Sequence, residues 1–254
     1  MKHRFSSLFT GIMLFFLFSA TTAVLHAQGS TSANDGEYDI RTGSFLLPQN
    51  LPGGKYTHSI AILYVVPPKD WTLDAIVAPM FSYTGKYTLP KGFNVQGGLA
   101  SLIISNRFNA GPFWNYSVGK YHFGVGYQVA FNFGLLRQFG FNTTLTGWET
   151  QPSFTAGYNF GKTALTIRGD LYNTLSINLN EAGNTISAKE SFLNGWSITT
   201  SFEQRLTKTK KGKERVMSLG FKLNYLRYHI IAWPALPASP YRYYMPEFQV
   251  GLNF

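Results

Sequence analysis

The sequence predicts a closed antiparallel β-barrel that spans a membrane, and three observations lead to this fold class. Segments of about ten residues alternate between apolar and polar side chains, as strands do between lipid and a polar lumen. Aromatic residues make up 17% of the chain and charged residues only 13%, whereas a soluble surface needs about 25% charge. The longest apolar run after the N-terminus is Ile60–Val66. A membrane helix needs about 20 apolar residues, so this run is too short for one. A closed barrel is the other structure in which every backbone N–H and C=O group is hydrogen-bonded in lipid.

The first 27 residues have the features of a secretory signal peptide. Lys2, His3 and Arg4 form a basic start, Leu8–Phe18 is an apolar core, and small residues allow cleavage after Ala27. Residues 28–55 are polar and rich in Gly, Ser and Asn, which predicts a flexible lead-in. An apolar patch within it, residues 45–47, either tucks into the barrel mouth or stays outside. The barrel is expected over residues 56–254.

The most regular strand is predicted at Tyr121–Gly134. Its odd positions, from Tyr121 to Phe133, are all apolar or aromatic, and its even positions are small or polar. Four less regular strands precede it, and the Pro67-Pro68 pair ends the first because proline cannot continue a ladder. Their predicted bounds are Tyr56–Val66, Trp71–Tyr83, Phe93–Ile104 and Arg107–Val118.

Five more strands are predicted after these, which gives a barrel of about ten. Such barrels have an even number of strands, short turns on one side and long loops on the other. Counted from the C-terminus, the long connections 135–151, 178–191 and 233–242 all fall on one side, and the turns 119–120 and 161–162 on the other. Eight or twelve strands stay open, because the pattern before Phe93 is less regular. The last five predicted strands are Pro152–Phe160, Thr163–Ile177, Phe192–Leu206, Arg215–Tyr228 and Tyr244–Phe254.

The final strand ends in Phe254, with Leu252, Val250 and Phe248 before it at alternate positions. This pattern resembles the C-terminal signature of bacterial outer-membrane proteins, in which the barrel assembly machinery reads a terminal aromatic residue in this register. The resemblance covers essentially the whole mature chain at the level of the class. It implies insertion in the outer membrane of a diderm bacterium, surrounded by lipid and lipopolysaccharide, with the lead-in on the periplasmic side.

Six charged residues are expected inside the lumen, because Arg or Lys facing lipid near the midplane costs about 2–4 kcal/mol. They either pair across strands and fill a narrow barrel, or they line a pore. Pairing is favoured since buried charges tend to be paired, and Arg168 with Glu203 is the expected pair. The six are Asp74, Arg168, Asp170, Glu203, Arg205 and Lys222.

Glycines expected on the inward face argue for space in the lumen or for strong coiling of the strands. Any open part of the lumen is therefore expected along the wall formed by Tyr121–Gly134. The inward glycines are predicted to be Gly124, Gly126, Gly157, Gly169, Gly195 and Gly220.

Residues with catalytic or metal-binding chemistry are few. The chain has no cysteine, and His58, His122 and His229 are scattered over the predicted mature chain, so no metal or cofactor is expected. Only His229, at a lipid-facing position near the outer end, is a candidate for a hydrolase site like those of outer-membrane proteases, acyltransferases and deacylases. The lysine-rich turn 207–214 is too short to suggest nucleic-acid binding.

The sequence therefore predicts a non-enzymatic outer-membrane barrel that is structural or supports passive passage of small solutes. The alternatives are a binding or adhesion barrel that uses its external loops, and a hydrolase acting on lipid or peptide. Trp233, Leu236 and Tyr241 are the candidate contacts, because the last external loop is apolar for a surface loop. A formal net charge of +10 weakly favours contact with lipopolysaccharide phosphates or anionic solutes. A soluble secreted β-sandwich is the competing fold class.

Overall fold

A computed structural model describes residue 40 and residues 43–68, 78–137, 142–181, 184–189, 191–206, 215–232 and 241–254. Residues 40–254 form one compact unit. The predicted signal peptide lies outside the described residues, and so do Asp74, Trp233 and Leu236. Among the described residues, no helix is long and apolar enough to cross a membrane.

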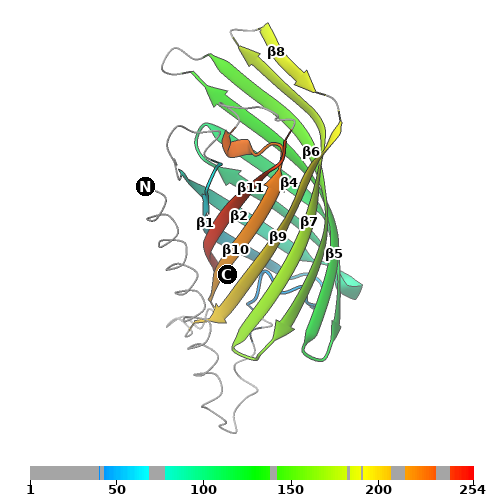
Figure 1. Ribbon diagram of the computed structural model, residues 1–254. Coiled ribbons are helices and arrows are strands. Elements are labelled where there is room, and N and C mark those ends of the chain that lie inside the picture. Colours follow the sequence, from blue (N-terminus) through cyan, green and yellow to red (C-terminus); the bar gives the residue numbers. More distant parts are fainter. Residues whose placement is uncertain are drawn as a thin grey trace. The chain divides into compact units, whose positions relative to one another are not determined.

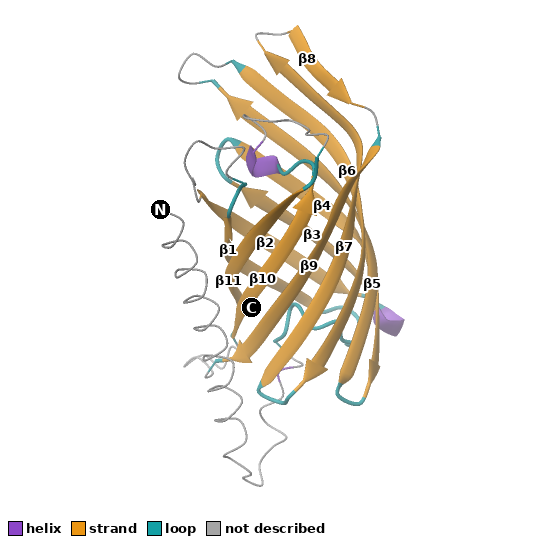
Figure 2. Cartoon of the chain, viewed as in Figure 1, coloured by secondary structure: helices purple, strands orange, loops and turns teal. Residues whose placement is uncertain are grey.

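The described residues form eleven β-strands, and ten of these close an antiparallel barrel (Figures 1 and 2). Pairing of β1 with β11 completes the wall, while β7 pairs with both β6 and β9. Strand β8 pairs with β7 and continues the wall beyond the closed part. The prediction of a barrel of about ten strands is confirmed. The strands are β1 (Tyr56–Val65), β2 (Ala78–Thr88), β3 (Phe93–Ser101), β4 (Ser105–Val118), β5 (Tyr121–Leu136), β6 (Thr143–Asn159), β7 (Thr163–Glu181), β8 (Asn184–Lys189), β9 (Phe192–Arg205), β10 (Val216–Leu226) and β11 (Tyr243–Asn253).

The side chains of the barrel wall divide by alternation. Along β5, Val125, Tyr127 and Val129 are exposed on the outside, whereas Gln128 and Asn132 are buried in the lumen. The exterior is therefore apolar and the interior polar, which is the reverse of a soluble protein and the arrangement that lipid requires.

Aromatic residues gather on the exterior near the end of the barrel where β1 begins and β11 ends, which we call the terminal end; the opposite end is the distal end. The ring centroids of Tyr121 and Tyr158 are 4.9 Å apart, and those of Tyr158 and Phe160 are 4.6 Å apart. Gly119 and Gly161 take positive φ values of 58° and 95° in the short turns at this end, a conformation that glycine adopts without steric cost. The terminal end corresponds to the side that the sequence assigns to the periplasm.

Several strands are longer than predicted. β5 runs to Leu136, β6 begins at Thr143 and β7 runs to Glu181, so most of the predicted long connection 135–151 is strand. The sequence prediction was wrong there because residues 143–151 lack an apolar alternation. Their inward positions mix polar and apolar residues, because Glu149 faces the polar lumen whereas Leu145 packs in a hydrophobic cluster. The predicted connection 178–191 likewise holds the end of β7 and all of β8.

Candidate functional site

A segment that precedes β1 lies inside the barrel near the terminal end, and we call residues Ser44–Gln49 the plug (blue in Figure 1). All of its residues are buried except the half-buried Leu46. Lys86 Nζ on β2 donates a hydrogen bond of 2.7 Å to the carbonyl of Phe45, and Asn115 Nδ2 on β4 donates one of 3.1 Å to the carbonyl of Gln49. The plug is thus bonded to separate strands of the wall. The predicted lead-in, expected to be flexible, is packed in this part, and the apolar patch lies inside.

A single carboxylate on β9 holds the plug in place. Glu203 is fully buried and accepts hydrogen bonds from the backbone N–H groups of Phe45, Leu46 and Leu47 at 2.9, 3.1 and 3.2 Å. The hydroxyl of Ser44 donates to the same carboxylate, and Asn253 Nδ2 on β11 donates at 2.6 Å. Hydrogen bonds to an ionised group are about twice as strong as neutral ones, so Glu203 acts as a latch for the plug.

Inward glycines provide the space that the plug fills. A Cβ at Gly157 would lie 2.5 Å from Leu47 Cδ1, and one at Gly124 would lie 2.8 Å from Pro48 Cβ. The open lumen expected along Tyr121–Gly134 is therefore occupied at its terminal end. The prediction that Gly169 faces inward is wrong. Gly169 lies between the inward Arg168 and Asp170 on β7, so alternation places it on the outside of the barrel. No atom lies within 4 Å of the position that its Cβ would take.

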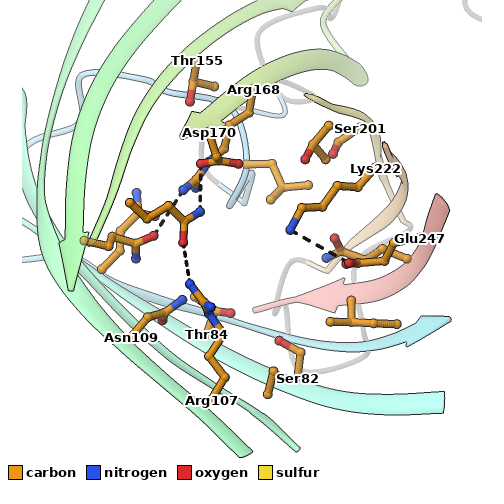
Figure 3. Close-up of a pocket in the computed structure, with 18 of the residues that line it drawn as sticks. Ser82, Thr84, Arg107, Asn109, Thr155, Arg168, Asp170, Ser201, Lys222 and Glu247 are labelled. Carbon is orange, nitrogen blue, oxygen red and sulfur yellow. Dashed lines mark hydrogen bonds and ion pairs between the residues drawn. The ribbon is translucent and has the colours of Figure 1, made fainter. Parts of the chain in front are cut away.

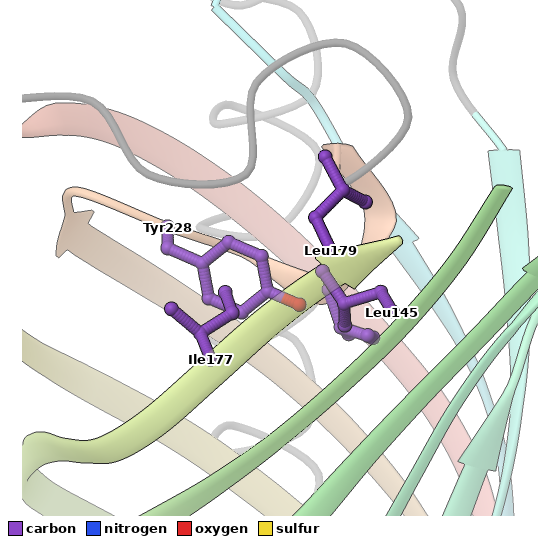
Figure 4. Close-up of a cluster of buried hydrophobic side chains, with 5 residues drawn as sticks. Leu145, Ile177, Leu179 and Tyr228 are labelled. Carbon is purple, nitrogen blue, oxygen red and sulfur yellow. The ribbon is translucent and has the colours of Figure 1, made fainter. Parts of the chain in front are cut away.

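At the distal end, the segment that follows β10 folds inward, and we call residues Tyr228–Ile231 the cap. Tyr228 and Ile230 are buried with Leu145, Ile177 and Leu179 of β6 and β7 (Figure 4). The side chain of Asn194 on β9 fixes the start of this segment, because its Oδ1 accepts from the Tyr228 N–H at 2.9 Å and its Nδ2 donates to the Tyr228 carbonyl at 3.0 Å. The cap thus crosses from β10 toward β6 and β7.

Between the plug and the cap lies a polar chamber of about 240 Å³ (Figure 3). Its lining includes Phe45–Pro48 of the plug and Tyr228–Ile230 of the cap. Hydroxyl and amide side chains such as Ser82, Thr84 and Asn109 line part of the chamber, and charged side chains line another part. Apolar side chains, among them Met80 and Phe113, also contribute to the lining.

Three ion pairs stand in the chamber wall. Arg107 on β4 pairs with Glu149 on β6. Arg168 Nε lies 2.8 Å from Asp170 Oδ1. Finally, Lys222 Nζ on β10 lies 3.9 Å from Glu247 Oε2 on β11. Two of the pairs are connected, since Gln151 accepts a hydrogen bond from Arg107 Nη2 at 3.0 Å and donates one to Asp170 at 2.9 Å.

The expected pairing of Arg168 with Glu203 is wrong. Arg168 is opposite Thr199 in the ladder, whereas Glu203 is opposite Ala164, so the two positions are four residues apart along β9. Arg168 pairs with Asp170, two residues along its own strand and on the same face, and Glu203 serves the plug. Arg168 also donates to Gln128 Oε1 at 3.2 Å.

The other residues predicted for the lumen are placed as follows. Asp170 and Lys222 line the chamber with Arg168, and Glu203 lies below it at the plug. Arg205 lies at the terminal end of β9, where its N–H donates to the Lys162 carbonyl at 3.0 Å, and it is not part of the chamber lining among the described residues.

Sequence reasoning missed Lys86, Arg107, Glu149 and Glu247 as residues of the site. Arg107 and Glu247 have the inward parity of their predicted strands, so alternation alone could have found them. Lys86 and Glu149 fell outside the predicted strands because β2 continues to Thr88 and β6 begins at Thr143. A charged residue in the sequence can be assigned to the lumen only when the strand that contains it has been predicted, because the strand gives the alternation of inward and outward positions.

The sequence alternation predicted that His229 faces lipid, which is wrong. His229 lines the chamber. β10 ends at Leu226, so the alternation does not extend to residue 229. The Ile231 N–H donates to His229 Nδ1 at 3.3 Å, and burial lowers the pKa of His229 to about 4. A general base works best with a pKa near the working pH, so His229 is poorly suited to that role. Among the described residues, no group of three or more His, Cys, Asp or Glu is arranged to hold a metal ion.

The residues of the C-terminal signature lie along β11. Val250, Leu252 and Phe254 are exposed on the exterior, and the Phe254 N–H donates to the carbonyl of His58 at 2.8 Å. Tyr241 precedes β11 at the distal end and is 71% exposed, where it is accessible to a partner.

No protein-family model matches the chain, and neither does any curated protein. The solved translocator domain of the autotransporter NalP from Neisseria meningitidis is 11% identical over 93% of this chain and 96% of that chain, with a TM-score of 0.38. Neisserial surface protein A is 13% identical over 78% of this chain and 94% of that chain, with a TM-score of 0.35. The P. putida toluene transporter TodX is 9% identical over 78% and 87%, with a TM-score of 0.28.

The fold class follows from the strand pairing and the side chains of the barrel wall. Ten strands close with β1 against β11, aromatic and aliphatic side chains cover the exterior, and polar side chains fill the interior. This combination satisfies the backbone in lipid, and the chain is therefore a closed ten-stranded antiparallel β-barrel of the membrane-spanning type.

Proposed function

We propose that the protein is a non-enzymatic outer-membrane barrel that passes small polar solutes and rests with its lumen closed by the plug. The observation that carries this proposal is the Glu203 latch. The plug crosses a lumen that glycines have cleared for it, and one carboxylate binds three successive backbone N–H groups of the plug. Water can replace such hydrogen bonds, so that their net contribution is only about 1.5–3 kcal/mol each. The plug can therefore leave while the ladder of the wall stays intact.

The location in the outer membrane is part of the proposal. The exterior aromatic residues at the terminal end suit the lipid interface, and the outward Val250, Leu252 and Phe254 suit recognition by the barrel assembly machinery. Lipid and lipopolysaccharide are the surroundings that an apolar exterior and a basic chain of net charge +10 favour.

A hydrolase is the less favoured function. Its candidate His229 uses Nδ1 to accept from a backbone N–H and has a pKa of about 4. The ring therefore has neither the basicity nor the available nitrogen that activation of a serine or water at Nδ1 would need.

A binding barrel has one observation in its favour. The β7–β8 hairpin projects beyond the closed part of the wall at the distal end (Figure 1), and this is the side that the sequence assigns to the cell exterior. A partner could dock there without entering the lumen.

The plug is tested by conductance in planar lipid bilayers. We expect the wild-type protein to be closed most of the time, and the Glu203→Gln variant to open more often because the latch loses its charge. A variant without Ser44–Gln49 is expected to stay open.

The conservative Glu203→Asp variant, which keeps the charge, is the matched control and should stay closer to wild type. Heat-modifiable migration on a gel checks that every variant folds. Absence of current at any voltage from a folded variant without the plug would overturn the proposal.

A further inference from the structure

We infer that the chamber is a binding site for a small anion that carries carboxylate or phosphate groups, with Arg107, Arg168 and Lys222 as its contacts. The inference deepens the proposed function, on which it rests for the path by which the solute enters and leaves.

The exposure of the three ion pairs is asymmetric. The side chains of Arg107, Arg168 and Lys222 are 16%, 26% and 23% exposed, whereas those of their partners Glu149, Asp170 and Glu247 are 2%, 3% and 7% exposed. All six residues line the chamber, so this exposure is toward its interior. The ion pairs are neutral as pairs, yet the surface that they present to a solute is cationic.

The buried carboxylate of Glu149 already has its hydrogen-bond partners. Glu149 accepts from Arg107, from Asn132 Nδ2 at 3.2 Å and from Asn194 Nδ2 at 2.9 Å. Arg107 and the two asparagine amides hold the charge of Glu149 in the wall and leave this carboxylate little capacity for a cationic solute.

The second carboxylate is held in the same way. Asp170 accepts from Arg168 at 2.8 Å, from Gln151 at 2.9 Å and from Ser197 at 3.3 Å. The chamber therefore offers cationic donors to a solute while its two most deeply set acids are engaged.

The three cations converge from different parts of the wall. Arg107 enters from β4, Arg168 from β7 and Lys222 from β10, and Figure 3 shows their side chains pointing into the same chamber. Lys222 Nζ is 3.9 Å from its carboxylate partner, which is beyond a direct hydrogen bond, so its ammonium can donate to a solute. An arginine fork matches the geometry of a carboxylate or phosphate.

Neutral donors complete the site. Thr166 lines the chamber, and its buried hydroxyl has no hydrogen-bond partner among the described residues. Ser82, Thr84 and Ser201 line it as well. The volume of about 240 Å³ is large enough for several water molecules. The chamber therefore suits a solute of the size of a short dicarboxylate.

Binding is tested by calorimetric titration of the refolded full chain in detergent, with succinate and inorganic phosphate as probes. Succinamide, which is neutral, and butane-1,4-diamine, which is cationic, are the matched ligands. We expect succinate or phosphate to bind saturably and both controls to fail.

A double variant, Lys222→Gln with Glu247→Gln, removes one exposed cation together with its buried partner. Affinity for succinate should fall about tenfold, as expected for the loss of a charge-assisted contact. The Lys120→Gln variant removes one cation from an exposed turn and should bind as the parent does. Equal binding of the diamine, or an affinity unchanged in the double variant, would overturn the inference.

Conductance separates this inference from the proposed function. If the variant without the plug conducts but the full chain binds neither succinate nor phosphate, the anion site is wrong and the pore stands. If the full chain binds succinate but the variant without the plug carries no current, the anion site stands and the proposed passage of solutes is wrong.

Discussion

Gly157 and Leu47 show how single residues decide whether the lumen is open. A glycine in a strand weakens it and often marks a close approach of another part of the chain. Here the approach is that of the plug, because a Cβ at Gly157 would lie 2.5 Å from Leu47 Cδ1. The sequence indicated empty space at the inward glycines. At Gly124 and Gly157 the plug fills this space, whereas at Gly126 the wall residue Phe113 fills it.

Valine at Gly157 is predicted to displace the plug while leaving the wall folded. The readout is a Leu46→Cys substitution, which introduces the only cysteine of the chain, labelled with a water-soluble maleimide. We expect labelling to be faster in the Gly157→Val variant, since the added side chain occupies the position of Leu47.

Gly169→Val is the matched control, because Gly169 is also a strand glycine but has nothing within 4 Å of its Cβ position. Its labelling rate should equal that of the parent. Equal rates in all three proteins would show that Leu47 does not hold the plug at Gly157.

The charges inside the barrel show the limits of sequence at the same scale. Alternation places Arg168, Asp170 and Lys222 on the inward face, since a lipid-facing charge is costly. It cannot select their partners, because an arginine reaches along its own strand as well as across to the next. Asp170 is two residues from Arg168 and on the same face, and it became the partner in place of the predicted Glu203.

At the scale of elements, the plug is an irregular segment that behaves as part of the barrel. Its composition resembles a loop, and no periodicity marks it. Its latch, Glu203, is 156–159 residues away in sequence from the plug residues that it binds. Such a contact exists only after the wall has closed, and this is why the sequence left the position of residues 45–47 open.

Strand β8 is predicted to be dispensable for the barrel. It pairs with β7, and the closed wall runs directly from β7 to β9. Deletion of Asn184–Lys189 should therefore leave the heat-modifiable migration and the single-channel behaviour unchanged.

The comparison for this deletion is removal of an equal length from β9, which should prevent folding because β9 pairs with both β7 and β10. If the β8 deletion abolishes attachment to a partner surface while conductance is kept, the binding alternative gains over the solute pore. Failure of the β8 deletion to fold would show that the hairpin supports the wall.

At the scale of the whole molecule, closure of the sheet decides stability. The β1–β11 ladder pairs Ser59–Val65 with residues 247–253, so the wall has no unpaired edge among its ten strands. In lipid or detergent, opening the wall would expose backbone groups that have no water to bond.

We expect the protein to need detergent for extraction from membranes, and to migrate faster on a gel before boiling than after it. The physical reason is that the closed ladder resists sodium dodecyl sulfate until heat breaks it. Extraction in buffer alone, with a single gel band at both temperatures, would instead favour the soluble β-sandwich that the sequence left as a competitor.

The sequence by itself predicted the fold class, a strand count of about ten, the outward face of the well-alternating strands and the presence of charge in the lumen. These follow from local rules, since a strand between lipid and water must alternate and must avoid charge on its lipid face. Only the tertiary structure decided that the plug and the cap border a chamber, that Glu203 binds the plug and that the cations are more exposed than their acidic partners. Those features depend on contacts between residues far apart in sequence, and such contacts form only when the barrel closes.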